Sequence, residues 1–182
     1  MDDRRLVKIS RYLSKHLRHR PERLGLQLEA GGWVEVQALL DACRRTSFEL
    51  SHAELVEVVQ RNDKRRYRFD ETGTRIRANQ GHSVPIDLQL EAVEPPTILY
   101  HGTGHATLEV ILIDGLRPMG RHHVHLSSDM GTAIKVGARR GRPAVLEVAS
   151  GRMHAQGATF LRSDNDVWLN DHVAVEHLTV LA

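Results

Sequence analysis

The chain has 182 residues, 41% of them hydrophobic, which is enough for one ordinary domain or two small ones. No stretch approaches the ~20 apolar residues that span a bilayer, and the charged start MDDRRLVKIS lacks the apolar segment of a signal peptide. The single cysteine, Cys43, excludes an internal disulfide and a zinc site built from several cysteines. We therefore expect a globular cytoplasmic protein without a membrane anchor.

The charged residues are unevenly distributed along the chain. Residues 1–90 hold 17 Lys and Arg against 13 Asp and Glu, whereas residues 91–182 hold 8 against 10. The cations of the first half are clustered at residues 15–23 and 61–77. Clustered cations suit a polyphosphate partner, but a solvated surface gives the same pattern, and charge alone does not decide between them.

The first half predicts three helices followed by a β-hairpin. Apolar residues recur at helical spacing, Pro21 stops the first helix, and Ser51 with Glu54 forms a capping-box pattern. The helices are expected at residues 4–19, 36–45 and 51–61. The hairpin is expected at residues 64–69 and 74–78, with a turn at 70–73, and residues 24–35 are expected to be extended. This order is typical of a winged helix, a module that commonly binds nucleic acid.

The second half predicts a different architecture. Residues 84–97 favour a linker, because Pro95 and Pro96 forbid continuous helix there. Short strands are expected at residues 98–100, 123–127, 143–149, 167–169 and 177–181, with helices at 105–113 and 128–137. Strands outnumber helices, which indicates an α+β lobe with a sheet core. We assign residues 1–90 to the first lobe and residues 91–182 to the second.

A cationic run, Lys15-His16-Leu17-Arg18-His19-Arg20, ends the first predicted helix. Pairing with the helix dipole explains one or two of these five cationic or cationisable side chains, but hardly all of them. An arginine beside a histidine can hold a phosphate, because arginine donates two parallel hydrogen bonds and histidine exchanges a proton near pH 7. We therefore interpret Arg18 and His19 as a candidate phosphate site.

The predicted hairpin carries a second basic site. Alternate residues of a strand share a face, so Lys64 and Arg66 should project together, with Arg65 opposite. A solvated edge strand, which cations protect against pairing, is the alternative. The loop Gln80-Gly81-His82-Ser83 follows the hairpin directly and is by itself ordinary loop material.

In the second half, two strand ends carry candidate ligand-binding groups. His101-Gly102-Thr103 follows a short apolar strand, where the glycine permits close approach of a ligand to the backbone. His125-Leu126-Ser127-Ser128 leads from a strand into a helix, and such an end offers backbone donors to an anion. Each of these motifs is weak when taken alone.

Three further features have competing interpretations. Arg139-Arg140-Gly141-Arg142 follows a predicted helix and is either a favourable basic helix end or a phosphate clamp. His123 and His125 share a strand face and could chelate zinc, but no Cys or HExxH motif supports this, so no metal site is expected. Trp168 and Cys43 are expected in the core. No Walker or GxGxxG fingerprint is present.

Taken together, eight segments resemble one family, the tRNA 2′-phosphotransferases, which are NAD-dependent RNA 2′-phosphotransferases. The segments occur in the family's order and cover nearly the whole chain. They are SKHLRHRP (14–21), GGWVEV (31–36), NDKRRYRF (62–69), IRANQGHS (76–83), LYHGT (99–103), HVHLS (123–127), VGARRG (136–141) and VWLNDHV (167–173). The resemblance implies an N-terminal winged-helix lobe that holds RNA and a C-terminal lobe of the ADP-ribosyltransferase fold that binds NAD⁺.

The resemblance also implies roles for individual residues. The family's Arg-His-Arg-Arg set would correspond to Arg18, His19, Arg66 and Arg139. The neighbours Arg65 and Arg140 are local alternatives to the last two, and strand alternation favours Arg66. His101 resembles the first histidine of the ADP-ribosyltransferase signature, which contacts the adenosine ribose. Other residues implied at the NAD site are Gly102, Thr103, His125, Leu126 and Ser127. Further RNA or phosphate contacts are implied for Lys15, Lys64, Gln80, His82 and Arg140. His125 stands where many ADP-ribosyltransferases carry tyrosine, and the third signature residue has no match.

The implied reaction consumes NAD⁺ in two steps and needs no metal. The RNA 2′-phosphate attacks the nicotinamide ribose, which gives a 2′-phospho-ADP-ribosylated RNA and nicotinamide. The ribose 2″-hydroxyl then attacks the phosphate, giving 2′-hydroxyl RNA and ADP-ribose 1″,2″-cyclic phosphate. The arginines bind the phosphate and His19 assists the second step. The expected partners are NAD⁺ and a tRNA-like RNA, and the protein is expected to be a monomer.

Two alternatives stay open at this point. The same arginines could serve an enzyme that caps terminal phosphates of RNA or DNA with ADP-ribose. A winged helix with a ligand-binding lobe could also be a regulator without catalytic activity, which would leave the Arg18-His19 pair unexplained.

Overall fold

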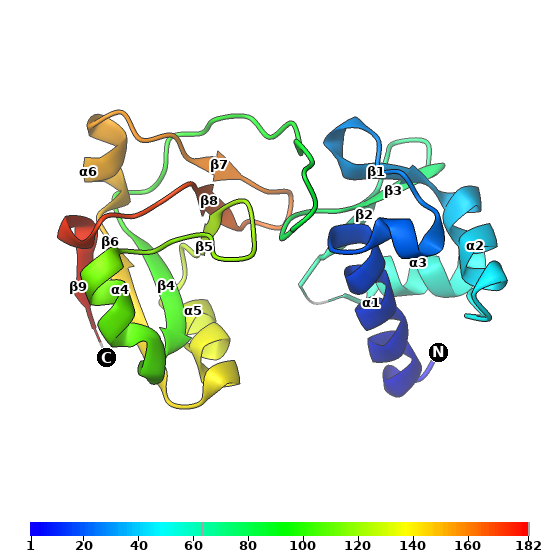
Figure 1. Ribbon diagram of the computed structural model, residues 1–182, viewed down its shortest axis with the longest axis horizontal. Helices are drawn as coiled ribbons and strands as arrows, with labels where there is room; N and C mark the ends of the chain where they lie inside the picture. The colour runs from blue at the N-terminus through cyan, green and yellow to red at the C-terminus, as the bar shows by residue number, and fades with distance from the viewer. Residues whose placement is uncertain (63, 182) are drawn as a thin grey trace. The chain divides into compact units, whose positions relative to one another are not determined.

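The computed structural model describes residues 1–62 and 64–181. The chain divides into two compact units, Met1–Gln89 and Leu90–Ala182 (Figure 1). Both units combine helices with small antiparallel sheets, so the predicted α+β class is confirmed. Within the described residues, none of the helices has the length and apolar character needed to cross a membrane.

The first unit contains the predicted helices and hairpin. Its helices are α1 (Asp3–Arg18), α2 (Val36–Arg45) and α3 (His52–Gln60), and its strands are β1 (Trp33–Glu35), β2 (Tyr67–Phe69) and β3 (Arg75–Ala78). Ser51 and Glu54 form the predicted capping box at the start of α3. The expectation of extended structure over 24–35 is wrong at two places. Leu24 ends a 3₁₀ helix that is followed by Gly25 with positive φ, and Ala30–Gly32 form a 3₁₀ turn in which Gly31 and Gly32 take positive φ.

The three strands of the first unit form one antiparallel sheet in the order β1-β3-β2. Ile76 in the central strand lies opposite Val34 on one side and Phe69 on the other. Because strand residues alternate between faces, this row turns inward to the core, where it joins Leu13 and Leu17 of α1. Cys43 of α2 belongs to the same core, as predicted, and burial raises the pKa of its thiol to about 11.

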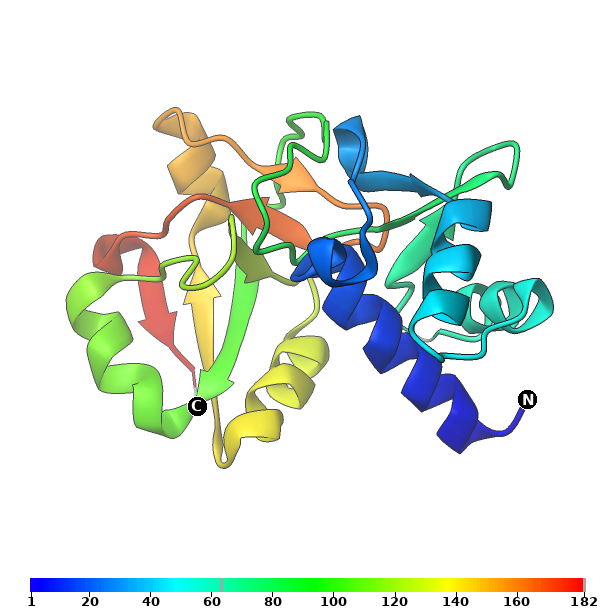
Figure 2. The ribbon, with the colours of Figure 1, turned by 45° about the vertical axis from the view of Figure 1, so that its right-hand side comes forward.

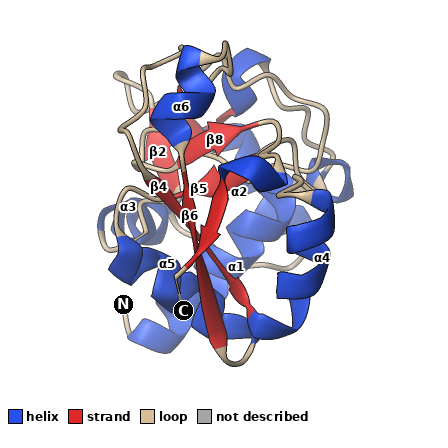
Figure 3. Ribbon diagram, turned by 90° about the vertical axis from the view of Figure 1, so that its left-hand side faces the viewer, coloured by secondary structure: helices blue, strands red, loops and turns tan. Residues whose placement is uncertain are grey.

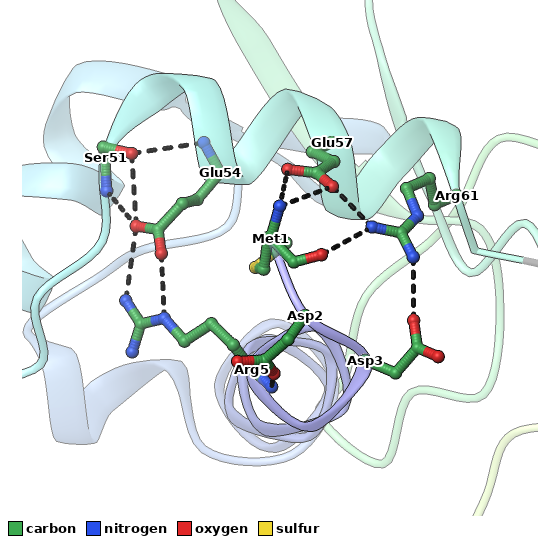
Figure 4. A network of polar contacts seen from close by, with 8 residues as sticks. All are labelled: Met1, Asp2, Asp3, Arg5, Ser51, Glu54, Glu57 and Arg61. Carbon is green, nitrogen blue, oxygen red and sulfur yellow. Dashed lines mark hydrogen bonds and ion pairs between the residues drawn. The ribbon is translucent and has the colours of Figure 1, made fainter.

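A polar network holds the start of α1 against α3 (Figure 4). Arg5 Nε donates to Glu54 Oε1 over 2.8 Å, and the guanidinium of Arg61 lies 2.7 Å from Asp3 Oδ1. The N-terminal amine completes the network by donating to both oxygens of Glu57 over 3.1 Å. These contacts fix the axis of α1, whose last turn carries Arg18.

The second unit is built from six strands and three α-helices among its described residues. Its strands are β4 (Leu99–Gly104), β5 (Val124–Leu126), β6 (Pro143–Val148), β7 (Leu161–Arg162), β8 (Trp168–Asn170) and β9 (Leu178–Val180). Its helices are α4 (Leu108–Asp114), α5 (Met130–Gly137) and α6 (Ser150–Ala155), which lie around the strands (Figure 3). Each strand predicted from the sequence has a counterpart here, and β7 was not predicted.

The strands of the second unit form two antiparallel sheets, β4-β6-β9 and β5-β8-β7. Figure 2 shows β9, β6 and β4 side by side, with α5 next to β4. A bridge between Tyr100 and Ser127 joins the two sheets, with N–H···O distances of 2.7 and 2.9 Å. Leu99, Phe160 and Trp168 meet in the core between them, which confirms the predicted burial of Trp168.

Strand β4 extends further than the sequence indicated. His101, Gly102 and Thr103 lie inside it and pair with β6, rather than following a shorter strand as a loop. A Cβ atom on Gly102 would lie 1.7 Å from the carbonyl oxygen of Ala133 in α5. Glycine is therefore required so that β4 and α5 can touch. Its predicted second role, to make room for a ligand, stays a prediction.

Candidate functional site

Arg18 is anchored at the end of α1 by contacts with two other segments. Its side chain is buried, its guanidinium lies 5.9 Å from the centre of the Tyr67 ring, and its Nη2 donates to the carbonyl of Arg66 over 3.4 Å. Its own carbonyl accepts from the backbone N–H of Ser83 over 2.9 Å. Arg18 thus joins α1, the start of the hairpin and the loop that follows the hairpin.

His19 follows directly and is exposed at the surface. Its Nδ1 lies 2.9 Å from the hydroxyl of Ser83, so the loop that holds the backbone of Arg18 also orients this imidazole. His16, in the same cationic run, is different: burial lowers its pKa, and its Nδ1 lies 3.2 Å from the carbonyl of Arg20. His16 therefore supports the helix end, while Lys15 is exposed.

The predicted geometry of the second basic site is wrong. Strand β2 begins at Tyr67, Lys64 lies in a turn, and Arg65 takes a positive φ of 39°. Strand alternation therefore does not place Lys64 and Arg66 on one face. The turn is stabilised by Asn79, whose N–H donates to the carbonyl of Arg66 over 2.9 Å and whose Nδ2 donates to that of Arg65 over 2.6 Å.

Asn62 orients the side chain of Arg66. Arg66 Nη1 donates to Asn62 Oδ1 over 3.3 Å, and the backbone N–H of Lys64 donates to the same oxygen over 3.1 Å. Asn62 itself is buried and donates to Ser10 Oγ in α1 over 3.2 Å. Sequence reasoning missed Asn62, although it begins the NDKRRYRF segment. Asp63, in the same segment, lies outside the described residues.

The loop after the hairpin lies against Arg18. A Cβ atom on Gly81 would be 3.5 Å from Arg18 Nη1, so this loop passes close to the guanidinium. Gln80 is half-buried, and His82 is buried beside Gly32. The structure therefore brings Arg18, His19 and Arg66 together with the loop 80–83 within the first unit.

In the second unit, His101 lies on β4 with its ring turned toward β5. Its Nδ1 is 3.1 Å from the carbonyl oxygen of His125. Burial lowers the pKa of His101, and the nearby cations Arg140 and Arg121 lower it further. His101 is therefore neutral at pH 7, with the proton on Nδ1 and a lone pair on Nε2. The hydroxyl of Thr103 lies 2.7 Å from that of Thr107 and is buried.

Arg121 was not predicted as a site residue. Its Nη1 lies 3.1 Å from Nδ1 of His125. The residue is exposed overall, and its pKa is lowered first by partial desolvation of the guanidinium and then by Arg140 and Arg139, so these two cations are close enough to act on Arg121. Arg139 and Arg140 are exposed in the 3₁₀ turn after α5. Such a group of cations favours an anionic ligand.

The start of α5 is capped from within. Asp129 Oδ2 accepts from the backbone N–H of Thr132 over 2.6 Å, and Ser127 Oγ donates to the carbonyl of Asp129 over 3.0 Å. The contact with Thr132 is the main cause that lowers the pKa of Asp129. The backbone N–H groups of Asp129 and Thr132 are therefore occupied by side chains of the chain itself. The expectation that the strand end His125–Ser128 offers backbone donors to an anion stays a prediction.

The histidine cluster shows no chelating geometry. His123 precedes β5 and its Nε2 lies 3.5 Å from Asp171 Oδ1, while His125 contacts Arg121. Within residues 1–62 and 64–181, no three His, Cys, Asp or Glu side chains gather as metal ligands.

Comparison with known proteins identifies the family. The model of the family described as RNA 2′-phosphotransferase, Tpt1 / KptA family, matches residues 4–172. The chain is 55% identical over 180 residues to a probable RNA 2′-phosphotransferase of Herpetosiphon aurantiacus, covering 99% of both chains. It is 56% identical over 181 residues to that of Trichormus variabilis, covering 100% of both, and 56% identical over 180 residues to that of Streptomyces griseus, covering 95% of both. The chain therefore belongs to the RNA 2′-phosphotransferase family.

Proposed function

We propose that this protein removes an internal 2′-phosphate from RNA by transferring it to NAD⁺. The observation that carries the proposal is the placement of Arg18, His19 and Arg66. Arg18 contacts the backbone of Arg66, and Ser83 contacts both Arg18 and His19. Two arginines and a histidine held by one scaffold suit a phosphate dianion, because guanidinium groups donate paired hydrogen bonds to its oxygens.

The first unit is proposed to act as a winged helix that binds RNA. Three helices and an antiparallel sheet of β1, β3 and β2 follow the order of that module. Contacts of Lys15, Lys64, Gln80 and His82 with RNA belong to the same proposal. Binding through phosphate groups would make the affinity for RNA depend strongly on salt and weakly on sequence.

The second unit is proposed to have the ADP-ribosyltransferase fold and to bind NAD⁺. Its two antiparallel sheets meet where β4 and β5 bring His101 and His125 together. The lone pair on His101 Nε2 can accept a hydrogen bond from a ribose hydroxyl, and Arg121, Arg139 and Arg140 suit a diphosphate. Gly102 lies against α5, so we propose it as a structural residue of this site rather than a ligand contact.

The proposed reaction begins with substitution at the nicotinamide ribose. An oxygen of the RNA 2′-phosphate forms a bond to the anomeric carbon, and nicotinamide leaves with the electron pair of the broken C–N bond. The phosphate is already anionic, so Arg18 and Arg66 need only to hold it in line for attack. The product of this step is RNA joined to ADP-ribose through its 2′-phosphate.

In the second step, the ribose 2″-hydroxyl attacks the phosphorus atom and the bond to the RNA 2′-oxygen breaks. The attacking hydroxyl loses a proton and the departing RNA oxygen gains one. We propose that His19 carries the proton between them. Charge that develops on the phosphoryl oxygens is stabilised by the arginines. We include Arg139 as the fourth residue of the proposed Arg-His-Arg-Arg set only because its position in the sequence matches the family's pattern.

A single incubation tests the proposal. Purified protein is mixed with a short RNA that carries one internal 2′-phosphate, with and without NAD⁺ and in EDTA, and all products are read by mass spectrometry. NAD⁺-dependent loss of phosphate with formation of ADP-ribose 1″,2″-cyclic phosphate is the expected result. A stable ADP-ribose adduct would instead indicate a capping enzyme, and no reaction would leave a nucleic-acid-binding module.

Matched variants then test the residues. Arg18→Gln removes a guanidinium from the proposed phosphate site and is expected to lower the rate by about 10²–10³. Arg44→Gln removes an exposed guanidinium from α2 of the same unit and should leave the rate unchanged. His19→Ala is expected to let the ADP-ribosylated RNA accumulate. Full turnover by His19→Ala would contradict the role proposed for His19.

A further inference from the structure

Helix α1 carries a continuous row of cations on its exposed face. Arg4, Lys8, Arg11 and Lys15 are all exposed, and residues three or four apart are neighbours on a helix surface. At roughly 3.6 residues per turn, these four share an arc of about 80° with Arg18. Every residue of α1 within that arc is a cation, so no acidic or apolar side chain interrupts the row. We call Arg4, Lys8, Arg11 and Lys15 the α1 stripe.

The α1 stripe leads to the proposed phosphate site. Lys15 lies beside Arg18 on the helix, and Arg4 lies at the other end, roughly 21 Å from Arg18 at a rise of about 1.5 Å per residue. One strand of a duplex carries a phosphate for roughly every 3.4 Å of its axis, so several phosphates fit along this length. The stripe therefore suits a polyanion with one part held at Arg18, rather than a single anion.

Helix stability does not explain the α1 stripe. Like charges three or four residues apart on a helix repel one another, and Arg4 lies in the first turn, where the helix dipole disfavours a cation. Lys8 contacts the Phe48 ring, whose centre lies 5.9 Å from Nζ. Among the residues that the structure describes, none of the four cations forms an ion pair with a carboxylate that would offset this repulsion.

The other charged groups at the start of α1 are engaged within the protein. Arg5 pairs with Glu54 over 2.8 Å, and Asp3 pairs with Arg61 over 2.7 Å (Figure 4). Asp2 Oδ1 accepts from the backbone N–H of Arg5 over 2.7 Å. The carboxylates nearest to the stripe in the sequence are therefore occupied, and a negatively charged partner from outside the chain would complement it.

We propose that the α1 stripe is an RNA-binding surface, where Arg4, Lys8, Arg11 and Lys15 contact phosphates of the strand that continues from the nucleotide held at Arg18. Lys15 already belongs to the proposed function, whereas the other three extend the contact away from the reacting phosphate. The identity of the strand rests on the proposed function. Because contacts with phosphates carry no sequence information, this surface binds RNA of any sequence and sets the affinity rather than the rate of the chemical steps.

Binding to RNAs of two lengths tests the α1 stripe without catalysis. The full-length protein is titrated, in the absence of NAD⁺, into a fluorescent trinucleotide with one 2′-phosphate and into a longer RNA extended on both sides of it. Each phosphate contact with a single strand contributes about 0.7 to the slope of log affinity against log salt, so the three cations beyond Lys15 should make the slope for the longer RNA steeper by about 2. Equal slopes and affinities for the two RNAs would overturn the inference.

Variants then locate the surface on α1. Arg11→Gln removes one contact and is expected to lower the slope for the longer RNA by about 0.7 and, in about 0.1 M salt, to weaken its binding about fivefold. Lys8→Gln combined with Arg11→Gln should weaken that binding about 25-fold. Arg44→Gln, which removes an exposed guanidinium from α2, is the matched control and should bind as the wild type does. Wild-type binding by the double variant, or an equal loss in Arg44→Gln, would show that RNA does not lie along α1.

Turnover separates this inference from the proposed function. The double variant should raise KM for the longer RNA by the same factor as its Kd and keep kcat, because the stripe binds the ground state and the transition state equally. A lower kcat with an unchanged KM would contradict this. A wild type that binds the longer RNA through the stripe but does not remove the phosphate would contradict only the proposed function. A wild type that removes the phosphate from both RNAs with equal KM would contradict only the inference.

Discussion

Gly102→Ala is expected to destabilise the second unit through the contact between β4 and α5. The added Cβ would lie 1.7 Å from the carbonyl oxygen of Ala133, whereas ordinary contacts begin near 3.4 Å. Relief requires α5 to move by about the difference between these distances, because the obstacle is backbone and not a flexible side chain. Overpacking of this kind lowers the unfolding free energy by about 1–3 kcal/mol. Because the obstacle here is backbone, we expect a loss of about 3 kcal/mol, the upper end of this range.

This loss of unfolding free energy can be converted into a change in melting temperature. Each kcal/mol corresponds to roughly 4–8 °C for a domain of ~60–100 residues, so the second unit of Gly102→Ala should melt about 12–24 °C below the wild type. Thermal unfolding followed by calorimetry and by circular dichroism would measure this shift.

Gly120→Ala is the matched control, because a Cβ atom there meets nothing within 4 Å. Its unfolding free energy should stay within about 0.5 kcal/mol of the wild type. If Gly102→Ala melts like the wild type but binds NAD⁺ poorly, the packing argument fails, and the glycine makes room for a ligand after all.

Four other predictions follow from contacts described above. Ser51→Ala removes the capping box of α3 and should lower the unfolding free energy in urea by about 1 kcal/mol, whereas no loss would mean that the box contributes nothing. The pKa of Glu54, which is paired with Arg5, is lowered from 4.5 to about 2. Its contribution to the unfolding free energy is therefore present above pH 4.5 and is lost as the pH falls through about 2. Glu54→Gln should make the unfolding free energy less dependent on pH over this range. Because burial lowers the pKa of His101 below 6.5, calorimetric titration should find an NAD⁺ affinity that is constant above about pH 7 and falls in acid, and an affinity that rises in acid would contradict this. Asn62→Ala releases Arg66 and should lower the rate of phosphate removal about tenfold, and it should also lower the melting temperature because its buried contact with Ser10 is lost. An unchanged rate would show that Asn62 does not position Arg66.

Elements whose signals are local could be predicted from the sequence. The helix over residues 36–45 was predicted at its observed bounds, and the capping box at Ser51 was predicted with its partner Glu54. Both depend on residues within one or two turns of chain. The hairpin was also predicted, because its two β-prone runs flank a turn.

Features that depend on contacts between distant segments could not be predicted. The turn at Lys64 and Arg65 is held by Asn79 from the end of the hairpin, so strand alternation gave the wrong face for Lys64. The contact of Gly102 with Ala133 appears only when β4 and α5 pack together. Asn62 and Arg121 contact the side chains of Arg66 and His125, and neither residue type indicates such a contact in the sequence.

The single buried thiol gives this protein a built-in reporter of local opening. Cys43 lies in the core of the first unit, and its raised pKa of about 11 keeps it protonated as well as covered. Only a thiolate that reaches solvent reacts with a disulfide reagent, so the labelling rate measures how often the first unit opens. Gly102→Ala, with its change in the second unit, then provides a test of cooperativity: unchanged labelling of Cys43 would mean that the two units unfold separately, and faster labelling would mean that they unfold together.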